Sequence, residues 1–148
     1  MKRASHFPPM IGVEKKAFLV YQVSTVAIFV IMPFLEVRTS QTLLFYTGIT
    51  VYMIGLVLLI LSAVNFSAPS ESGINQNGLY RLSRNPMYVA YFICLVGICL
   101  LVLSPVLLGV IILFQISAHW IILSEERWCI EQFEAEYLLY MNKVRRYF

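Results

Sequence analysis

One polar stretch of the sequence combines residue types that can bind a charged ligand. Residues 78–88 read Gly-Leu-Tyr-Arg-Leu-Ser-Arg-Asn-Pro-Met-Tyr, and they lie in an otherwise very apolar chain. A second polar group, Glu125 and Glu126, follows a long apolar segment. Polar side chains held against lipid are costly and mark functional sites. The two groups are therefore predicted to face each other in one site, with the rest of the chain as their frame.

The order Arg84-Asn85-Pro86 is also typical of a helix start. Proline is favoured at the first helical position, and asparagine just before it. A helix start alone leaves unexplained why Tyr80, Arg84 and Tyr88 crowd the same place. The free N–H groups of a helix start also attract anions. A ligand carboxylate would therefore fit there.

Glu125 and Glu126 are predicted to end an apolar helix, where a carboxylate lies at the unfavourable end of the helix dipole. That position indicates a partner, either a cation such as Arg84 or a ligand hydroxyl or amine. The alternative is a pair of interfacial carboxylates without a ligand. His119 precedes Glu126 by seven residues, so both lie on nearly the same helical face. His119 is a candidate proton acceptor, and a neutral, hydrogen-bonded interior histidine is the alternative.

The composition identifies an integral membrane protein. Of 148 residues, 59% are hydrophobic and 13% are charged, and the mean hydropathy is +0.76. Soluble domains are about 45–50% apolar and about 25% charged. The net charge of +3 gives no basic patch for nucleic acid. The three cysteines, Cys94, Cys99 and Cys129, have no metal-ligand spacing, so no metal site is expected.

The predicted fold is an all-α, polytopic membrane protein with about four transmembrane helices. Uncharged segments predict spans at residues 17–35 and 42–64. Gly48 and Gly55 share a face of the second span, where small residues permit close helix packing. Pro105 predicts a turn in a helical hairpin of residues 86–103 and 106–123. Residues 124–148 predict an amphipathic helix that lies on the membrane interface or folds back over the site.

Basic residues predict the orientation in the membrane. Four lie before the first span, two lie before the third span, and four lie in the tail, whereas the first short loop has one. The positive-inside rule then places both termini and the site in the cytoplasm.

The polar residues resemble a known pattern. Gly78-x-Tyr80-x-x-x-Arg84-Asn85-Pro86-x-Tyr88, an apolar hairpin, Glu125-Glu126, and Phe133-x-x-x-Tyr137-x-x-Tyr140-x-x-x-Val144-x-Arg146 are similar to the integral-membrane methyltransferases. That superfamily includes the isoprenylcysteine carboxyl methyltransferases and the phospholipid N-methyltransferases. The resemblance covers residues 73–148. It implies one domain over residues 1–148, with two N-terminal spans in 1–72 and a catalytic, cofactor-binding half in 73–148.

The resemblance implies S-adenosyl-L-methionine as the cofactor and a membrane lipid, or a lipid-like molecule, as the methyl acceptor. The catalytic residues would be Arg84, Glu126 and His119. The cofactor-binding residues would be Ile74, Gly78, Tyr80, Arg84, Asn85, Pro86, Met87, Tyr88, Glu125 and Glu126.

Three positions depart from the pattern. Asn85 stands where the prenylcysteine enzymes carry His, whereas the phospholipid enzymes often carry Asn there. Ala90 stands where Gly is usual. Ile122 stands where many relatives place an Arg that faces a substrate carboxylate. These departures favour an amine or phospholipid acceptor over a prenylcysteine carboxylate. Two other functions compete with methyl transfer. One is an NADPH-dependent sterol-type reductase, but the extra spans and longer loops usual in such enzymes do not fit in 148 residues. The other is a non-catalytic helical membrane protein.

Overall fold

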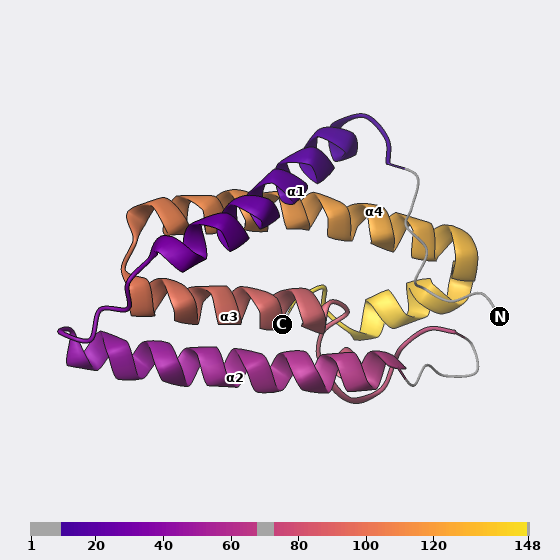
Figure 1. Ribbon diagram of the computed structural model, residues 1–148. Coiled ribbons are helices and arrows are strands. Elements are labelled where there is room, and N and C mark those ends of the chain that lie inside the picture. The colour runs from indigo at the N-terminus through magenta and orange to yellow at the C-terminus, as the bar shows by residue number, and fades with distance from the viewer. Residues whose placement is uncertain (1–9, 68–72, 148) are drawn as a thin grey trace.

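The described residues form a helical bundle without a β-sheet. The computed structural model describes residues 10–67 and 73–147. The element order is α1 (Val13–Ile31), the short 3-10 helix η1 (Met32–Phe34), α2 (Thr42–Ser67), the 3-10 helix η2 (Gly78–Arg81), α3 (Pro86–Val102) and α4 (Pro105–Lys143) (Figure 1). The predicted all-α, polytopic membrane fold is confirmed. Lys2 and Arg3 of the basic lead, and residues 68–72 of the loop before the motif, lie outside the described residues.

Among the described residues, three segments are long and apolar enough to cross a membrane: Val13–Phe34, Thr42–Ser67 and Pro105–Lys143. The remaining apolar helix, α3, has 17 residues. At about 1.5 Å per residue it extends roughly 25 Å, slightly less than the roughly 30 Å of a hydrocarbon core. Four complete crossings therefore stay a prediction.

Close helix contacts explain the glycines. α2 packs along α3, and α1 packs along α4 (Figure 1). A Cβ atom on Gly55 would lie 2.6 Å from the backbone nitrogen of Cys94, and one on Gly97 would lie 2.6 Å from that of Tyr52. The prediction that Gly48 and Gly55 permit close packing is confirmed, since a Cβ atom on Gly48 would lie 2.9 Å from Cγ of Leu101. α1, α3 and α4 share a core of Ile28, Leu95, Leu107, Ile111 and Phe114.

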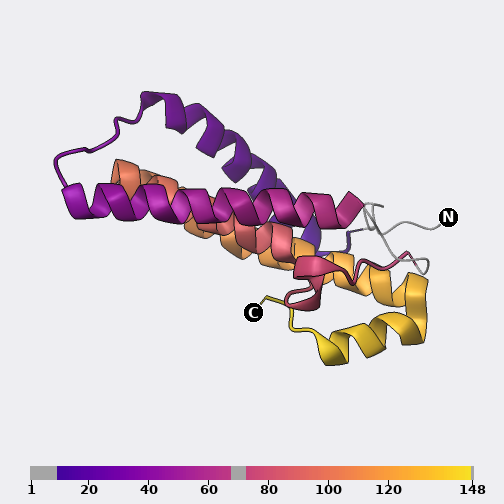
Figure 2. The same ribbon diagram turned by 90° about the horizontal axis from the view of Figure 1, so that it is seen from below.

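The predicted hairpin turn is present, but the helix after it is longer than expected. Leu103 takes a left-handed conformation (φ 52°), and the hydroxyl of Ser104 accepts a hydrogen bond from the Leu107 amide at 3.3 Å. α4 then continues past residue 123 to Lys143 and bends sharply only at Glu134 (φ 46°, ψ −122°). The expected boundary at residue 124 is wrong, because no glycine or proline follows Gly109 to stop the helix. After the bend, the last part of α4 folds back beside the start of α3 (Figure 2).

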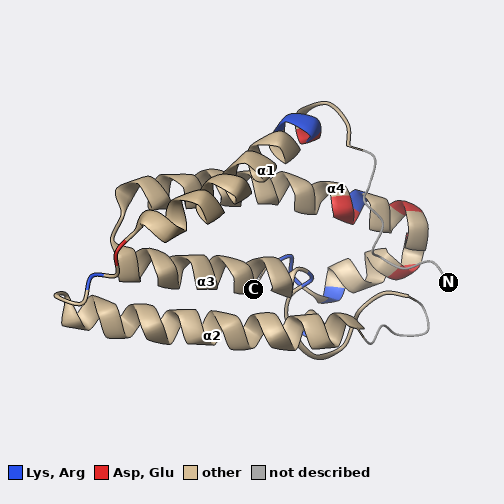
Figure 3. Cartoon of the chain, in the orientation of Figure 1, with Lys and Arg blue, Asp and Glu red and all other residues tan. Residues whose placement is uncertain are grey.

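Most charged side chains lie at one end of the bundle. Figure 3 shows charges at the start of α1, near the start of α3 and along the last third of α4. The opposite end holds Glu36, Arg38 and the turn between α3 and α4, and there the Arg38 amide donates to the Leu101 carbonyl at 2.9 Å. The motif at residues 78–88 and the Glu125-Glu126 pair thus lie at the same end, as the sequence predicted.

Candidate active site

The motif begins with a short turn that only glycine permits. Gly78 opens η2 with φ +54°, and a Cβ atom there would lie 2.1 Å from Nδ2 of Asn65. The turn buries Tyr80, whose carbonyl accepts a hydrogen bond from the Tyr140 hydroxyl at 2.6 Å. Burial raises the pKa of Tyr80, and the nearby Glu125 carboxylate adds to that effect. The Tyr80 hydroxyl therefore stays protonated.

Asn85 occupies the N-cap position of α3, and Pro86 is the first helical residue, as predicted. The Asn85 side chain, however, makes no capping hydrogen bond. The Asn85 amide group instead donates to the Arg146 carbonyl at 3.2 Å and approaches Glu126 Oε1 at 3.4 Å. A helix start alone therefore does not account for Asn85, whose amide turns toward the candidate site.

The C-terminal segment holds the motif from the other side. The Arg84 amide donates to the Arg145 carbonyl at 2.9 Å, and Ser83 pairs with Arg145 in an isolated parallel bridge. The fully buried Ser83 hydroxyl accepts a hydrogen bond from the backbone N–H of Asn85 and donates one to the Arg146 carbonyl, both at 3.2 Å. Of the two predicted placements for the tail, folding back over the site is thus the one observed.

Glu126 is a buried carboxylate held by two arginines. Its Oε1 atom lies 3.1 Å from Arg84 Nη2, and its Oε2 atom accepts from Arg146 Nη2 at 2.8 Å and from Arg146 Nε at 2.9 Å. The Glu126 side chain is 5% exposed, the Arg84 side chain 7% and the Arg146 side chain 32%. The hydrogen bond with Glu126 raises the pKa of Arg146. Two guanidinium groups thus direct their charge to one carboxylate.

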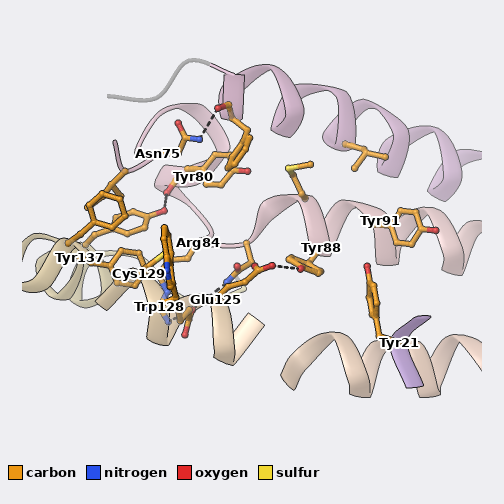
Figure 4. Close-up of a pocket in the computed structure, with 18 residues that line it drawn as sticks. Tyr21, Asn75, Tyr80, Arg84, Tyr88, Tyr91, Glu125, Trp128, Cys129 and Tyr137 are labelled. Atoms are coloured by element: carbon orange, nitrogen blue, oxygen red, sulfur yellow. Dashed lines mark hydrogen bonds and ion pairs between the residues drawn. The ribbon is translucent and has the colours of Figure 1, made fainter. Parts of the chain in front are cut away.

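Glu125 has a different environment. Its Oε1 atom accepts a hydrogen bond from the Tyr88 hydroxyl at 2.9 Å. No salt bridge joins Glu125 to a cation within the described part of the chain. Figure 4 shows this carboxylate between the cluster around Arg84 and the tyrosines of α1 and α3. Glu125, unlike its neighbour, thus has no described arginine beside it, and its carboxylate lines the cavity described next.

The two glutamates do not end a helix, contrary to the sequence-based expectation. They lie well inside α4, which continues to Lys143. The helix dipole is therefore not a source of destabilisation for them. The expected cation partner is nevertheless present, since Arg84 pairs with Glu126.

These groups surround a cavity of about 500 Å³. Half of its lining residues are aromatic, which suits a ligand with flat rings or a diffuse positive charge. Two buried polar atoms of the lining, Nε of Arg84 and Oδ1 of Asn75, have no hydrogen-bond partner among the described residues. Such atoms are rare in folded proteins and point to a missing ligand or solvent. The lining residues are Tyr21, Leu59, Phe66, Ile74, Asn75, Tyr80, Arg84, Asn85, Met87, Tyr88, Tyr91, Glu125, Glu126, Trp128, Cys129, Phe133, Tyr137 and Tyr140.

Most predicted site residues line this cavity, but three do not. Gly78 shapes the turn that carries Tyr80, and Pro86 starts α3; neither is a lining residue. His119 lies elsewhere, with its Nδ1 atom 2.6 Å from the Tyr147 hydroxyl. The structure thus favours the alternative of a hydrogen-bonded histidine over a proton acceptor in the site. Ile122 is fully buried and is not among the lining residues of this cavity.

Several lining residues were not predicted from the sequence. Phe133, Tyr137 and Tyr140 belong to the amphipathic tail pattern, but their direction depends on the bend at Glu134. Trp128 and Cys129 lie two and three residues after Glu126 and could have been included by proximity. Asn75 comes from the polar loop before the motif, and the others come from apolar segments: Tyr21, Leu59, Phe66 and Tyr91.

Comparison with known proteins identifies the family. The family model for phospholipid methyltransferase matches residues 43–136. Protein-S-isoprenylcysteine O-methyltransferase of Saccharomyces cerevisiae is 39% identical over 77 residues, which are 51% of this chain and 32% of the yeast protein. The aligned part is thus about a third of that relative's length. No solved structure matches the chain. Because the family model covers more than half of the sequence and the motif lies within it, this chain belongs to the phospholipid methyltransferase family.

Proposed function

We propose that this protein transfers a methyl group from S-adenosyl-L-methionine to a lipid or lipid-like acceptor in the membrane. The observation that carries the proposal is the cavity in which the motif of residues 80–88 meets Glu125 and Glu126. When bound, the donor supplies a methyl group on a positively charged sulfur; transfer breaks the carbon–sulfur bond, whose electron pair stays on sulfur, and forms a bond to the acceptor. The protein's part is to position the two molecules and to exclude water.

The residues fit this donor by charge. It carries a positive sulfonium, a positive ammonium and a negative carboxylate. Glu125, which no described cation neutralises, can balance a positive group. The unpartnered Nε of Arg84 can donate to a carboxylate. Tyr80, Trp128 and Tyr137 present aromatic faces to the same cavity, where they can contact the adenine ring or the sulfonium.

The arginines also favour an amine acceptor over a carboxylate. Arg84 and Arg146 are both paired with Glu126, and Arg127 pairs with Glu14 at the start of α1. If the donor carboxylate occupies Nε of Arg84, a carboxylate acceptor would face Glu125 without a further described arginine to offset the repulsion. An ammonium acceptor could give its proton to Glu125 and attack the methyl carbon with the freed nitrogen lone pair. The preference for an amine thus depends on the paired arginines and no longer on Ile122, which does not face the cavity.

The asymmetric charge distribution supports a cytoplasmic site. Figure 3 shows lysines and arginines at the start of α1, near the start of α3 and in the last part of α4, all at the end of the bundle that holds the cavity. The positive-inside rule assigns that end to the cytoplasm. Both termini would then also be cytoplasmic.

Isothermal titration of the detergent-purified protein with S-adenosylmethionine and, separately, with NADPH tests the proposal. Binding of the former alone is expected. Tyr88→Phe removes the hydrogen bond to Glu125 and keeps the ring, so it should raise the dissociation constant about tenfold, equivalent to about 1.4 kcal/mol. Tyr46→Phe on the exposed face of α2 is the matched control. Binding of NADPH would support the reductase instead, and binding of neither would support a non-catalytic protein.

A further inference from the structure

The cavity has a wall from α1, which lies outside the matched residues 43–136. That wall is Tyr21. Its ring stacks on Phe114 of α4 with 4.8 Å between centroids and 29° between planes. Tyr91 of α3 packs against the same phenylalanine at 5.5 Å. Phe114 thus supports Tyr21 and Tyr91 together at the end of the cavity away from Arg84 (Figure 4).

This end of the cavity, formed by Tyr21, Leu59, Met87 and Tyr91, is named the apolar arm. Tyr21 is eight residues after the start of α1, and Leu59 is eight residues before the end of α2. At about 1.5 Å per residue, both lie roughly 12 Å along their helices from the charged end. The arm therefore reaches from Glu125 into the apolar part of the bundle.

The side chains of the arm are mostly apolar surface with hydroxyl groups at their tips. No hydrogen bond joins the Tyr21 or Tyr91 hydroxyl to another residue in the described ranges 10–67 and 73–147. The opposite end of the cavity instead holds Arg84, Glu126 and Asn75, with buried polar atoms. The polar methyl donor suits that end. The arm suits an acceptor molecule that has one polar group on an otherwise apolar body.

An ion pair holds the start of α1 against α4. Arg127 of α4 donates to both carboxylate oxygens of Glu14, with Nη2 2.9 Å from Oε2. Glu14 also accepts from the Ile11 amide at 2.9 Å, which ties the pair to the first turn of α1. Tyr21 follows Glu14 by seven residues, so both lie on nearly the same face of α1. The charged contact at the helix start thus turns Tyr21 toward α3 and α4.

We propose that the apolar arm holds the methyl acceptor and that Tyr21 is a specificity-determining residue for it. The inference rests on the proposed function. The acceptor would be a lipid-borne amine whose apolar part lies against Tyr21 and Tyr91 and whose nitrogen reaches Glu125. There the ammonium proton passes to the Glu125 carboxylate, the nitrogen lone pair forms the bond to the methyl carbon, and the carbon–sulfur electron pair leaves with the donor sulfur.

The test uses the full chain reconstituted in phosphatidylcholine vesicles with two acceptor probes. One is phosphatidylethanolamine, an amine, and the other is an S-farnesylcysteine analogue, a carboxylate. Methyl transfer from radiolabelled S-adenosylmethionine gives KM and kcat for the acceptor, and titration gives the donor's dissociation constant. Tyr21→Ala should raise the acceptor KM about tenfold, equivalent to about 1.4 kcal/mol, and change the donor's dissociation constant less than twofold. Tyr21→Leu, which retains apolar packing on Phe114, should show the same split to a smaller extent. Tyr46→Ala, on a tyrosine that is 64% exposed, is the control.

The possible results separate the two proposals. If the wild-type protein binds no S-adenosylmethionine, the proposed function fails and the apolar arm fails with it. If the donor binds but Tyr21→Leu leaves the acceptor KM unchanged, or weakens donor binding equally, only the assignment of the arm is overturned. Methylation of the farnesylcysteine analogue alone would overturn the amine assignment, and methylation of neither probe would overturn the assignment of the arm to a lipid acceptor.

Discussion

Arg146 is expected to stabilise the folded site through Glu126, and its replacement by alanine measures how much. The change removes two hydrogen bonds to the buried carboxylate, at 2.8 and 2.9 Å. Hydrogen bonds to charged groups contribute about 1.5–3 kcal/mol each, and loss of one partner from a buried pair costs about 3–5 kcal/mol. Arg146 is 32% exposed and Arg84 remains beside Glu126. Partial screening by water therefore lowers the expected loss to about 2 kcal/mol.

The assay is reversible unfolding of the detergent-solubilised protein, with Arg145→Ala as the matched control. Arg145 is the adjacent arginine, its side chain is exposed, and it engages the motif through its backbone. Its loss should change the free energy of unfolding by less than about 0.5 kcal/mol. In a Glu126→Gln background, Arg146→Ala should cost much less than in the wild type, because the charge that it neutralises is gone. Equal effects of the two arginine variants, or additive effects of Arg146→Ala and Glu126→Gln, would refute the reasoning.

Two further predictions concern the frame of the site. Gly55→Ala should destabilise the protein by about 1–3 kcal/mol, because the new Cβ atom would lie 2.6 Å from the Cys94 backbone nitrogen. The control Gly109→Ala, whose Cβ atom would have nothing within 4 Å, should leave the unfolding midpoint unchanged or higher. Equal destabilisation by both variants would contradict close packing at Gly55. In a chain without native cysteines, Ser40→Cys and Lys143→Cys should react with an impermeant thiol reagent from opposite sides of sealed vesicles, because the two positions lie at opposite ends of the bundle. Reaction of both variants from one side would contradict the predicted orientation.

The sequence was most informative where polar residues interrupt apolar segments. Tyr80, Arg84, Asn85, Tyr88 and the two glutamates could be grouped from the sequence alone, because charged side chains in a membrane chain are few and costly. Gly48 and Gly55 likewise predicted a packed face, since their spacing places them on one side of a helix.

The remaining site residues depend on tertiary structure. Tyr21 is one aromatic residue in an apolar span, and nothing local distinguishes its direction from that of exposed Phe29. Tyr137 and Tyr140 reach the cavity only because α4 bends at Glu134, a residue without an intrinsic signal for a left-handed conformation. His119 shares a helical face with Glu126 but lies beside Tyr147, because the C-terminal segment returns to that point. Periodicity gives the face of a helix and not the neighbour that covers it.

The returning C-terminal segment gives the two adjacent glutamates different roles. Without it, Glu126 would keep only Arg84 as a cation partner among the described residues, beside a second buried carboxylate that would repel it. The backbone pairing of residues 83–85 with residues 145–146 brings the Arg146 guanidinium to Glu126. Glu126 is then held by two arginines and fixes Arg84, whereas the Glu125 carboxylate accepts a hydrogen bond from Tyr88 and has no salt bridge within residues 10–67 and 73–147. A buried carboxylate without a cation partner takes up a proton more readily, and a positive ligand beside it favours the charged form. The fold-back of the tail thus directs both arginines to Glu126 and leaves the Glu125 carboxylate facing the cavity, where the proposed donor or an ammonium acceptor could pair with it.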